Sequence, residues 1–311
     1  MEVFTIKEKI IIDTDIGDDI DDALAIAMAV NSPEFEILGI TTVFRNTKAR
    51  ARLAVRLLKE MGREDIPVAA GIGVTFANGP VDTLFKFIDL NEKLGQYSDD
   101  MDDEQITYEG HGIDFIENTL MESSEAITLV SIGPLTNIAA LIIKNEFAKS
   151  KIKRIVLMGG AYNLNKAEYN ILCDPEAARV VFDSGIDIVG VGLDVTTKWQ
   201  LTEEEVEVIE KADTPTSRFI FKLISRFMGY AHHLPYLHDP LALITCFDKS
   251  VVKTEMKRIA VETRGEFTRG MTFNITNSRW WEDNKNSGNI EVCTEVDRDR
   301  VVRLFLQRVT R

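Results

Sequence analysis

The sequence feature that most constrains this chain is an acidic stretch between a β-branched run and an alanine-rich apolar run. Ile10 to Ile12 precede the stretch, Gly17 permits a sharp turn within it, and Ala23 to Ala29 follow it. This order predicts a strand, a loop and a helix. The loop and the first helical turn carry six carboxylates: Asp13, Asp15, Asp18, Asp19, Asp21 and Asp22.

Six like charges this close repel one another unless a positive charge lies among them. The N–H groups and dipole of a helix N-terminus favour anions, but one or two acidic residues satisfy a helix start. A hard divalent cation would compensate more of the six carboxylates, because Ca²⁺ binds several carboxylate and carbonyl oxygens in a flexible cage. Ligands of open α/β sheets bind beyond the carboxyl ends of the strands, which is where the cluster falls. The stretch therefore predicts a cation site, with an acidic N-cap on a solvated helix as the alternative.

Composition narrows the possible partners and the compartment. The chain has 311 residues, 45% of them hydrophobic, and a net charge of −14 without a basic stripe. This charge disfavours nucleic acid and anionic membrane surfaces as partners, and a neutral or cationic small ligand fits better. Three widely spaced cysteines without a CxxC pair indicate reduced thiols. We find no apolar leader and no membrane-length apolar window, so the expected location is the cytoplasm.

Strand-like and helix-like segments alternate through the first two thirds of the chain. The predicted strands are 10–12, 36–43, 66–69, 127–131, 155–158 and 186–193. The predicted helices between them are 23–29, 47–61, 113–121, 135–143 and 175–182, and residues 71–107 are expected to be irregular. Repeated β-α-β units favour an open, mostly parallel α/β sheet flanked by helices on both faces. We expect one domain over residues 1–311, with a boundary near Thr202 as the alternative.

Several other segments carry polar residues where the ligand-binding edge of the sheet is expected. Ile132 comes directly after the strand 127–131, and a main-chain carbonyl there is a possible calcium ligand. Glu168 and Asn170 could share the hydroxyls of a sugar, or belong to a polar loop. His238 and Asp239 precede Pro240, which favours the start of a helix. A structural His-Asp pair is the alternative interpretation of the last motif.

Taken together, these motifs resemble those of the inosine-uridine preferring nucleoside hydrolase family. The resemblance rests on the Asp-Thr-Asp-x-Gly opening with Asp21-Asp22-Ala23-Leu24, the turn 132–137, Glu168-Tyr169-Asn170 with Asp174-Pro175-Glu176, and His238-Asp239-Pro240. The motifs occur in the family's order between about Lys9 and Thr245. The resemblance implies a Rossmann-like nucleoside hydrolase fold, a bound Ca²⁺ and hydrolysis of ribonucleosides to free base and ribose. It also implies a homodimer or homotetramer and a role in purine or pyrimidine salvage.

The resemblance further implies roles for individual residues. Asp15 would be a calcium ligand and the base that takes a proton from a calcium-bound water. Asp22, the main-chain carbonyl of Ile132 and Asp239 would be the other ligands. His238 matches a position at which the family can place a general acid for the departing base. The ribose hydroxyls would be bound by four side chains, those of Asp21, Asn46, Glu168 and Asn170.

These roles agree with the chemistry of glycosidic cleavage. Positive charge grows on the ribose ring in an oxocarbenium-like transition state, while negative charge grows on the base. Acidic surroundings stabilise the first charge, and a proton donor or hydrogen bonds stabilise the second. A cation that binds water and the ribose diol together orients the attack and lowers the pKa of the water.

The acidic opening departs from the family pattern. Ile16 stands where family members often carry Pro, and two extra residues place Asp18 and Asp19 before Asp21 and Asp22. An alternative register gives Asp19 a ligand role in place of Asp21 or Asp22. The departures from the family pattern fall on the pocket wall and on the leaving-group side. The preference for one base over another is therefore open.

Two other functions compete with hydrolysis of nucleosides. A haloacid-dehalogenase-like phosphohydrolase also opens with a strand and Asp-x-Asp, and it would use Asp13 as nucleophile with Mg²⁺. A calcium-dependent nucleoside- or sugar-binding protein would keep the metal and the diol contacts without turnover. The presence of both Asp15 and His238 favours the enzyme.

Overall fold

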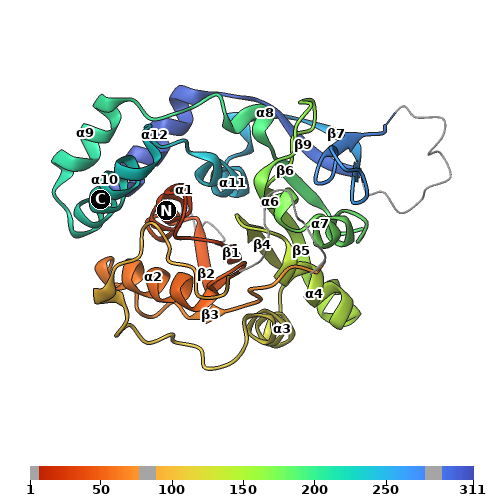
Figure 1. Cartoon of the computed structure of the whole chain (residues 1–311), viewed down its shortest axis with the longest axis horizontal. Coiled ribbons are helices and arrows are strands. Elements are labelled where there is room, and N and C mark those ends of the chain that lie inside the picture. The colour runs from red at the N-terminus through yellow and green to blue at the C-terminus, as the bar shows by residue number, and fades with distance from the viewer. Residues whose placement is uncertain (1–6, 77–88, 277–288) are drawn as a thin grey trace, which may run out of the picture.

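A nine-stranded sheet forms the centre of the computed structural model, which describes residues 7–76, 89–276 and 289–311 (Figure 1). The strand order is β3-β2-β1-β4-β5-β6-β9-β7-β8. All neighbours pair in parallel except β7 with β9 and β8 with β7. The strands are β1 (Glu8–Thr14), β2 (Phe35–Thr42), β3 (Val68–Ala70), β4 (Ile127–Ser131), β5 (Ile152–Met158), β6 (Ile188–Val191), β7 (Val252–Val261), β8 (Thr272–Asn274) and β9 (Asn289–Val296).

Helices cover both faces of this sheet (Figure 1). One set, which packs with the core that contains Ile10 and Ile12, includes α1 (Asp21–Val30), α2 (Thr47–Glu60), α9 (Glu203–Ala212), α10 (Pro215–Ala231), α11 (His238–Phe247) and α12 (Arg298–Val309). The other set packs with the core that contains Ile11 and includes α3 (Gly112–Glu122), α4 (Thr136–Lys144), α5 (Glu146–Ser150) and α7 (Pro175–Phe182). Two short helices, α6 (Tyr169–Cys173) and α8 (Leu193–Thr196), follow β5 and β6.

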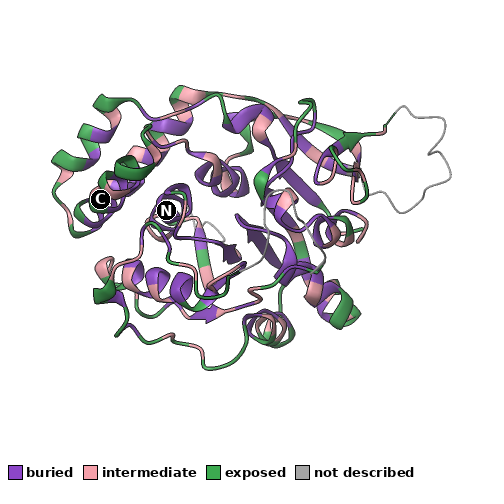
Figure 2. Ribbon diagram, viewed as in Figure 1, coloured by how far each residue is buried: buried purple, intermediate pink, exposed green. Residues whose placement is uncertain are grey.

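The two cores arise from the alternation of side chains along buried strands. On β4, Leu129 belongs to one core and Val130 to the other, and on β5 the same holds for Ile155 and Val156. Figure 2 shows buried residues throughout the central strands, as expected for a parallel sheet covered on both faces. The predicted α/β architecture is therefore confirmed.

One strand in the last third of the chain was not predicted from the sequence. This strand is β9, which lies between β6 and β7 and in which Ile290 and Val292 flank Glu291. Strands on both sides of Thr202 thus join one sheet, so the alternative boundary at Thr202 does not separate two sheets. Part of the expected irregular segment, residues 77–88, lies outside the described residues. Among the described helices, none has both the length and the apolar character to cross a membrane.

Candidate active site

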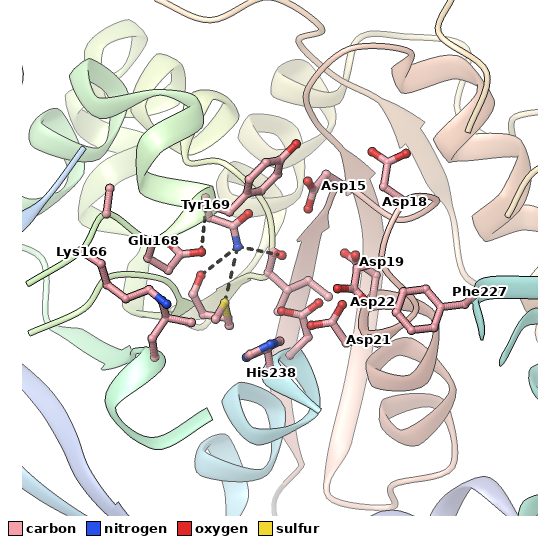
Figure 3. A pocket seen from close by; sticks show the side chains of 16 residues that line it. Asp15, Asp18, Asp19, Asp21, Asp22, Lys166, Glu168, Tyr169, Phe227 and His238 are labelled. Atoms are coloured by element: carbon pink, nitrogen blue, oxygen red, sulfur yellow. Dashed lines mark hydrogen bonds between the residues drawn. The ribbon is translucent and has the colours of Figure 1, made fainter. Parts of the chain in front are cut away.

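A cavity of about 520 Å³ lies beyond the carboxyl ends of β1, β4, β5 and β6 (Figure 3). This is the edge at which ligands bind in open α/β sheets, and the sequence placed the acidic cluster there. Figure 3 shows the aspartates that follow β1 gathered on one side of the pocket, with Lys166 and Glu168 on the other. The acidic residues that line it are Asp15, Asp18, Asp19, Asp21, Asp22, Glu168 and Asp239.

The acidic loop leaves β1 through a turn that requires glycine. Gly17 has a φ of +132°, and a Cβ atom there would lie 2.7 Å from Cδ1 of Leu94. The helix α1 begins at Asp21, so Asp21 and Asp22 occupy its first turn, where the helix dipole favours carboxylates. The predicted strand, loop and helix are thereby confirmed, with the apolar run 23–29 inside α1.

Three buried carboxylates converge in the pocket. Oxygen atoms of Asp21, Asp22 and Asp239 lie within 4.8 Å of one another, although Asp239 comes from the first turn of α11, far along the chain. Burial raises the pKa of all three carboxyls well above the ordinary value, and neighbouring aspartates raise it further. Such a group is the arrangement that a hard cation stabilises, because it supplies the missing positive charge.

The structure brings two of the four predicted ligands, Asp22 and Asp239, into one triad of carboxylates, and the ligand roles of Asp15 and Ile132 stay predictions. Asp22 and Asp239 meet as expected, but the carboxylate that completes the triad is that of Asp21, which was expected to bind ribose. Asp15 lines the same pocket, and its charge contributes to the raised pKa of Asp22. Ile132 also lines the pocket, and its carbonyl accepts a hydrogen bond from Asn170 Nδ2 at 3.3 Å.

Asp15 and Asp13 differ in their access to the pocket. Burial raises the pKa of Asp15 to about 7, against the opposing effect of the nearby Arg50 charge. Asp13, whose pKa burial also raises to about 7, accepts hydrogen bonds through Oδ1 from Thr41 at 2.5 Å and Asn137 at 2.8 Å. Asp13 does not belong to the described residues that line the pocket. Its position disfavours the phosphohydrolase alternative, which needs this side chain as nucleophile.

Glu168 and Asn170 lie on the opposite wall. The Glu168 carboxylate caps α6 and accepts three backbone N–H bonds, from Gly160 at 3.0 Å, Asn170 at 2.8 Å and Ile171 at 3.1 Å. Asn170 Nδ2 also donates to the carbonyl of Met158 at 3.2 Å. Both predicted sugar-binding residues are therefore in the pocket, with their side chains fixed by the surrounding backbone.

His238 begins α11 and lines the pocket. Its Nδ1 lies 2.7 Å from Thr196 Oγ1, and its ring is stacked on Tyr236 with centroids 5.5 Å apart. Burial lowers the pKa of His238 to about 4, and the charges of Lys166 and His233 lower it further. The imidazole is consequently neutral near pH 7, with one N–H to donate.

Asn46 does not belong to the described residues that line the cavity. It is the N-cap of α2, where its Oδ1 accepts from the N–H of Ala49 at 3.2 Å and its Nδ2 donates to the carbonyl of Glu92 at 3.1 Å. These two bonds hold the Asn46 side chain at the start of α2. Its role in sugar binding stays a prediction. Asp174, by contrast, is the N-cap of α7, where its side chain accepts a hydrogen bond from the N–H of Ala177.

Sequence reasoning missed several residues of the site. Lys166 and Phe227 line the pocket, one from the loop after β5 and the other from α10. The irregular sequence after Gly160 gave no indication of where Lys166 lies, and Phe227 is one of several apolar residues of α10, with nothing in its local pattern that marks a pocket residue. Arg50 was missed as well, because its position among basic residues of α2 is typical of a solvated helix face, yet it is fully buried.

Comparisons with known proteins agree with this geometry. The family model described as inosine-uridine preferring nucleoside hydrolase matches residues 10–303. The chain belongs to this family. A probable uridine nucleosidase 2 from Arabidopsis thaliana is 35% identical, with 97% of this chain and 98% of the relative covered. A pyrimidine-specific ribonucleoside hydrolase from Salmonella agona is 34% identical, with 96% of this chain and 97% of the relative covered.

Solved structures of nucleoside hydrolases share the fold along nearly the whole chain. A plant nucleoside hydrolase aligns with a TM-score of 0.83 at 28% identity, covering 97% of this chain and 99% of its own. A purine-preferring ribonucleoside hydrolase from Gardnerella vaginalis aligns with a TM-score of 0.81 at 28% identity, covering 97% and 98%. This nucleoside hydrolase is therefore an enzyme that cleaves the N-glycosidic bond of ribonucleosides, and neither the phosphohydrolase nor the non-catalytic binding protein is correct.

Proposed function

We propose that this nucleoside hydrolase binds Ca²⁺ at Asp21, Asp22 and Asp239 and uses Asp15 as the base that activates the attacking water. The observation that carries the proposal is the triad of buried carboxylates, whose oxygens lie within 4.8 Å of one another. The donors fit calcium, since all are hard oxygen atoms and the carbonyl of Ile132 adds another at the same pocket. When bound, the ion would lower the pKa of water and hold the neighbouring ribose hydroxyls.

Asp15 has the environment of a general base that works near neutral pH. Its carboxyl is buried, and burial raises its pKa to about 7 in the metal-free chain. A bound cation would lower this pKa and favour the ionised form, which accepts a proton. The carboxylates around it also stabilise the positive charge that develops on the ribose ring. Asp15 therefore takes a proton from the water that attacks C1′, and its negative charge contributes to cation binding.

Glu168 and Asn170 are proposed to bind the sugar from the opposite wall. A carboxylate has about four acceptor sites, and backbone N–H groups use three of them at Glu168. At least one site is left for a ribose hydroxyl, and the backbone bonds hold the carboxylate in place. Asp21 can serve the triad with one oxygen and a hydroxyl with the other.

His238 is proposed to stabilise the departing base by hydrogen bonding. We assign the Thr196 hydroxyl as the donor to Nδ1 of His238, so that the neutral ring carries its proton on Nε2. The Nε2–H group then donates to the base as negative charge grows there, when the electron pair of the C1′–N bond moves to the base nitrogen.

Uridine is the expected best substrate. The relatives that are 34–35% identical are named for uridine and for pyrimidine ribonucleosides, whereas the purine-preferring structure is 28% identical. A homodimer or homotetramer in the cytoplasm, acting in salvage of bases, stays a prediction from the family resemblance.

The proposal is tested with chelator-stripped protein and a panel of uridine, cytidine, inosine, uridine 5′-monophosphate and p-nitrophenyl phosphate. Released reducing sugar and phosphate are measured before and after addition of Ca²⁺ or Mg²⁺. We expect sugar release from uridine that is lost on stripping and restored best by Ca²⁺. Full activity of the stripped protein would refute the metal site, and faster cleavage of inosine would refute the substrate preference.

A further inference from the structure

The acidic loop, residues 15–19, accepts hydrogen bonds from side chains of three other segments. The first is Arg50 of α2, which is fully buried beneath the loop. Its Nη1 donates to the carbonyl oxygens of Asp15 and Ile16, the latter at 3.0 Å, and its Nη2 binds Asp18 Oδ2 at 2.8 Å. Arg50 thus links the exit from β1 to α2.

The second and third contacts come from the segment around Gln96 and from α10. Gln96 is fully buried, and its Nε2 donates to the carbonyls of Asp19 and Asp18, the latter at 3.4 Å. Its backbone N–H donates to the carbonyl of Gly17 at 2.9 Å. On α10, Tyr230 Oη donates to the carbonyl of Asp18.

Helix α10 also fixes Gln96 and reaches the pocket directly. Arg226 Nη1 donates to the main-chain carbonyl of Gln96 at 2.6 Å, one turn from Tyr230 on the same helix. Phe227, between these two residues, lines the pocket. The elements that hold the loop are therefore continuous with one wall of the cavity.

These contacts occupy every main-chain carbonyl from Asp15 to Asp19 with donors from outside the loop. The path of the loop is then set by protein donors, and Asp21 and Asp22, which follow it after Ile20, lie close to Asp239. We propose that Gln96 and Tyr230 are positioning residues of the cation site, which hold the acidic loop in its metal-binding shape before the cation arrives. This inference rests on the proposed calcium site.

Preorganisation of this kind is measurable as calcium affinity. If the loop must become ordered when calcium binds, the free energy of ordering it weakens the calcium affinity. Each lost contact that would have held the loop in advance therefore reduces the affinity. Gln96→Met keeps the length of the side chain and removes both of its donor bonds, so we expect calcium to bind roughly tenfold more weakly. Tyr230→Phe removes one bond at a partly exposed position, and a loss of about threefold is expected.

Calcium titration calorimetry on chelator-stripped full-length protein tests the inference. Gln200→Met and Tyr97→Phe are matched controls, because Gln200 donates to Leu234 and Tyr97 to Asp102, both outside the acidic loop. We expect the controls to bind calcium as the wild type does, and Gln96→Met and Tyr230→Phe to bind it more weakly.

A second readout separates positioning from general destabilisation. The rise in Tm on adding calcium is expected to shrink in Gln96→Met and Tyr230→Phe, and to keep its size in the controls. If Gln96→Met fails to fold, Tyr230→Phe decides the question. Wild-type affinity in both variants would overturn the inference, whereas a wild type that binds no calcium would overturn the proposed metal site itself.

Discussion

The pH dependence of calcium stabilisation follows from the triad of Asp21, Asp22 and Asp239. Their oxygens lie within 4.8 Å of one another, so each ionised pair repels by about 3 kcal/mol at an effective dielectric constant of about 20. Three pairs amount to about 10 kcal/mol if all are charged. In the metal-free protein the pKa of each group is raised, first because burial disfavours the charged form and then because protonation relieves the repulsion from neighbouring aspartates.

A raised pKa in the folded chain means that the folded state binds more protons than the unfolded state. The corresponding stability is fully present below the unfolded pKa and is lost as the pH rises through the folded pKa. In chelator, Tm is therefore expected to be lower at about pH 8 than at about pH 5.5, because the pKa values of the three carboxyls are raised in the folded chain. Calcium competes with protons for the same oxygens, so its stabilising effect is expected to grow over that interval.

The size of the effect can be estimated from linkage. Calcium at about a hundredfold excess over Kd adds about 2.7 kcal/mol to the free energy of unfolding. For 311 residues, an unfolding entropy of about 2.1 cal/mol/K per residue converts this into a rise in Tm of about 4 °C. We expect this gain near pH 8 and a clearly smaller one near about pH 5.5.

Differential scanning calorimetry with EDTA and with calcium, at both pH values, measures the gain. Asp239→Asn removes two of the three repelling pairs, so it should raise Tm in EDTA at high pH and abolish most of the calcium gain. Asp174→Asn is the matched control, because Asp174 is a buried helix cap that is not among the described pocket residues. A calcium gain that is equal at the two pH values, or larger at the lower one, would refute the reasoning.

Three further predictions concern single residues. Asp15→Asn should keep the fold and reduce ribose release by at least about a hundredfold, since the base is lost; activity near that of the wild type would assign the base elsewhere. Thr196→Val should lower kcat and change KM less, because the hydroxyl that fixes the tautomer of His238 is lost. Steady-state kinetics with uridine measures both constants, and an unchanged kcat would contradict this prediction. Glu168→Gln should cost about 1–3 kcal/mol in urea unfolding, because an amide nitrogen cannot accept the backbone N–H bonds, and an unchanged midpoint would contradict this.

The sequence by itself determined the strand, loop and helix around the acidic stretch and the edge of the sheet where it lies. These features are local, because β-branched runs, a turn glycine and an alanine-rich helix each act over a few neighbouring residues. The order of motifs also predicted that Asp22 and Asp239 would meet. That prediction came from the resemblance to the nucleoside hydrolase family, since Asp239 follows the helix α10 and not a strand.

Only the tertiary structure decided which carboxylate completes the triad and what holds the loop in place. Asp21 lies with Asp22 and Asp239, although it was expected to bind ribose, and its position depends on the whole path of the loop. The basic helix α2 gave no sign that Arg50 is buried, because a periodic pattern does not show which charged side chain finds acceptors inside the protein.

The same limit applies to the remaining parts of the site. Thr196 lies 42 residues from His238 in sequence, and Gln96 lies 77 residues from Asp19, yet each pair is joined by a hydrogen bond. Such contacts are fixed by how the helices pack on the sheet. Local sequence patterns therefore determine the secondary structure elements and which strand and helix ends carry the functional side chains. Long-range packing determines which atoms of these side chains meet.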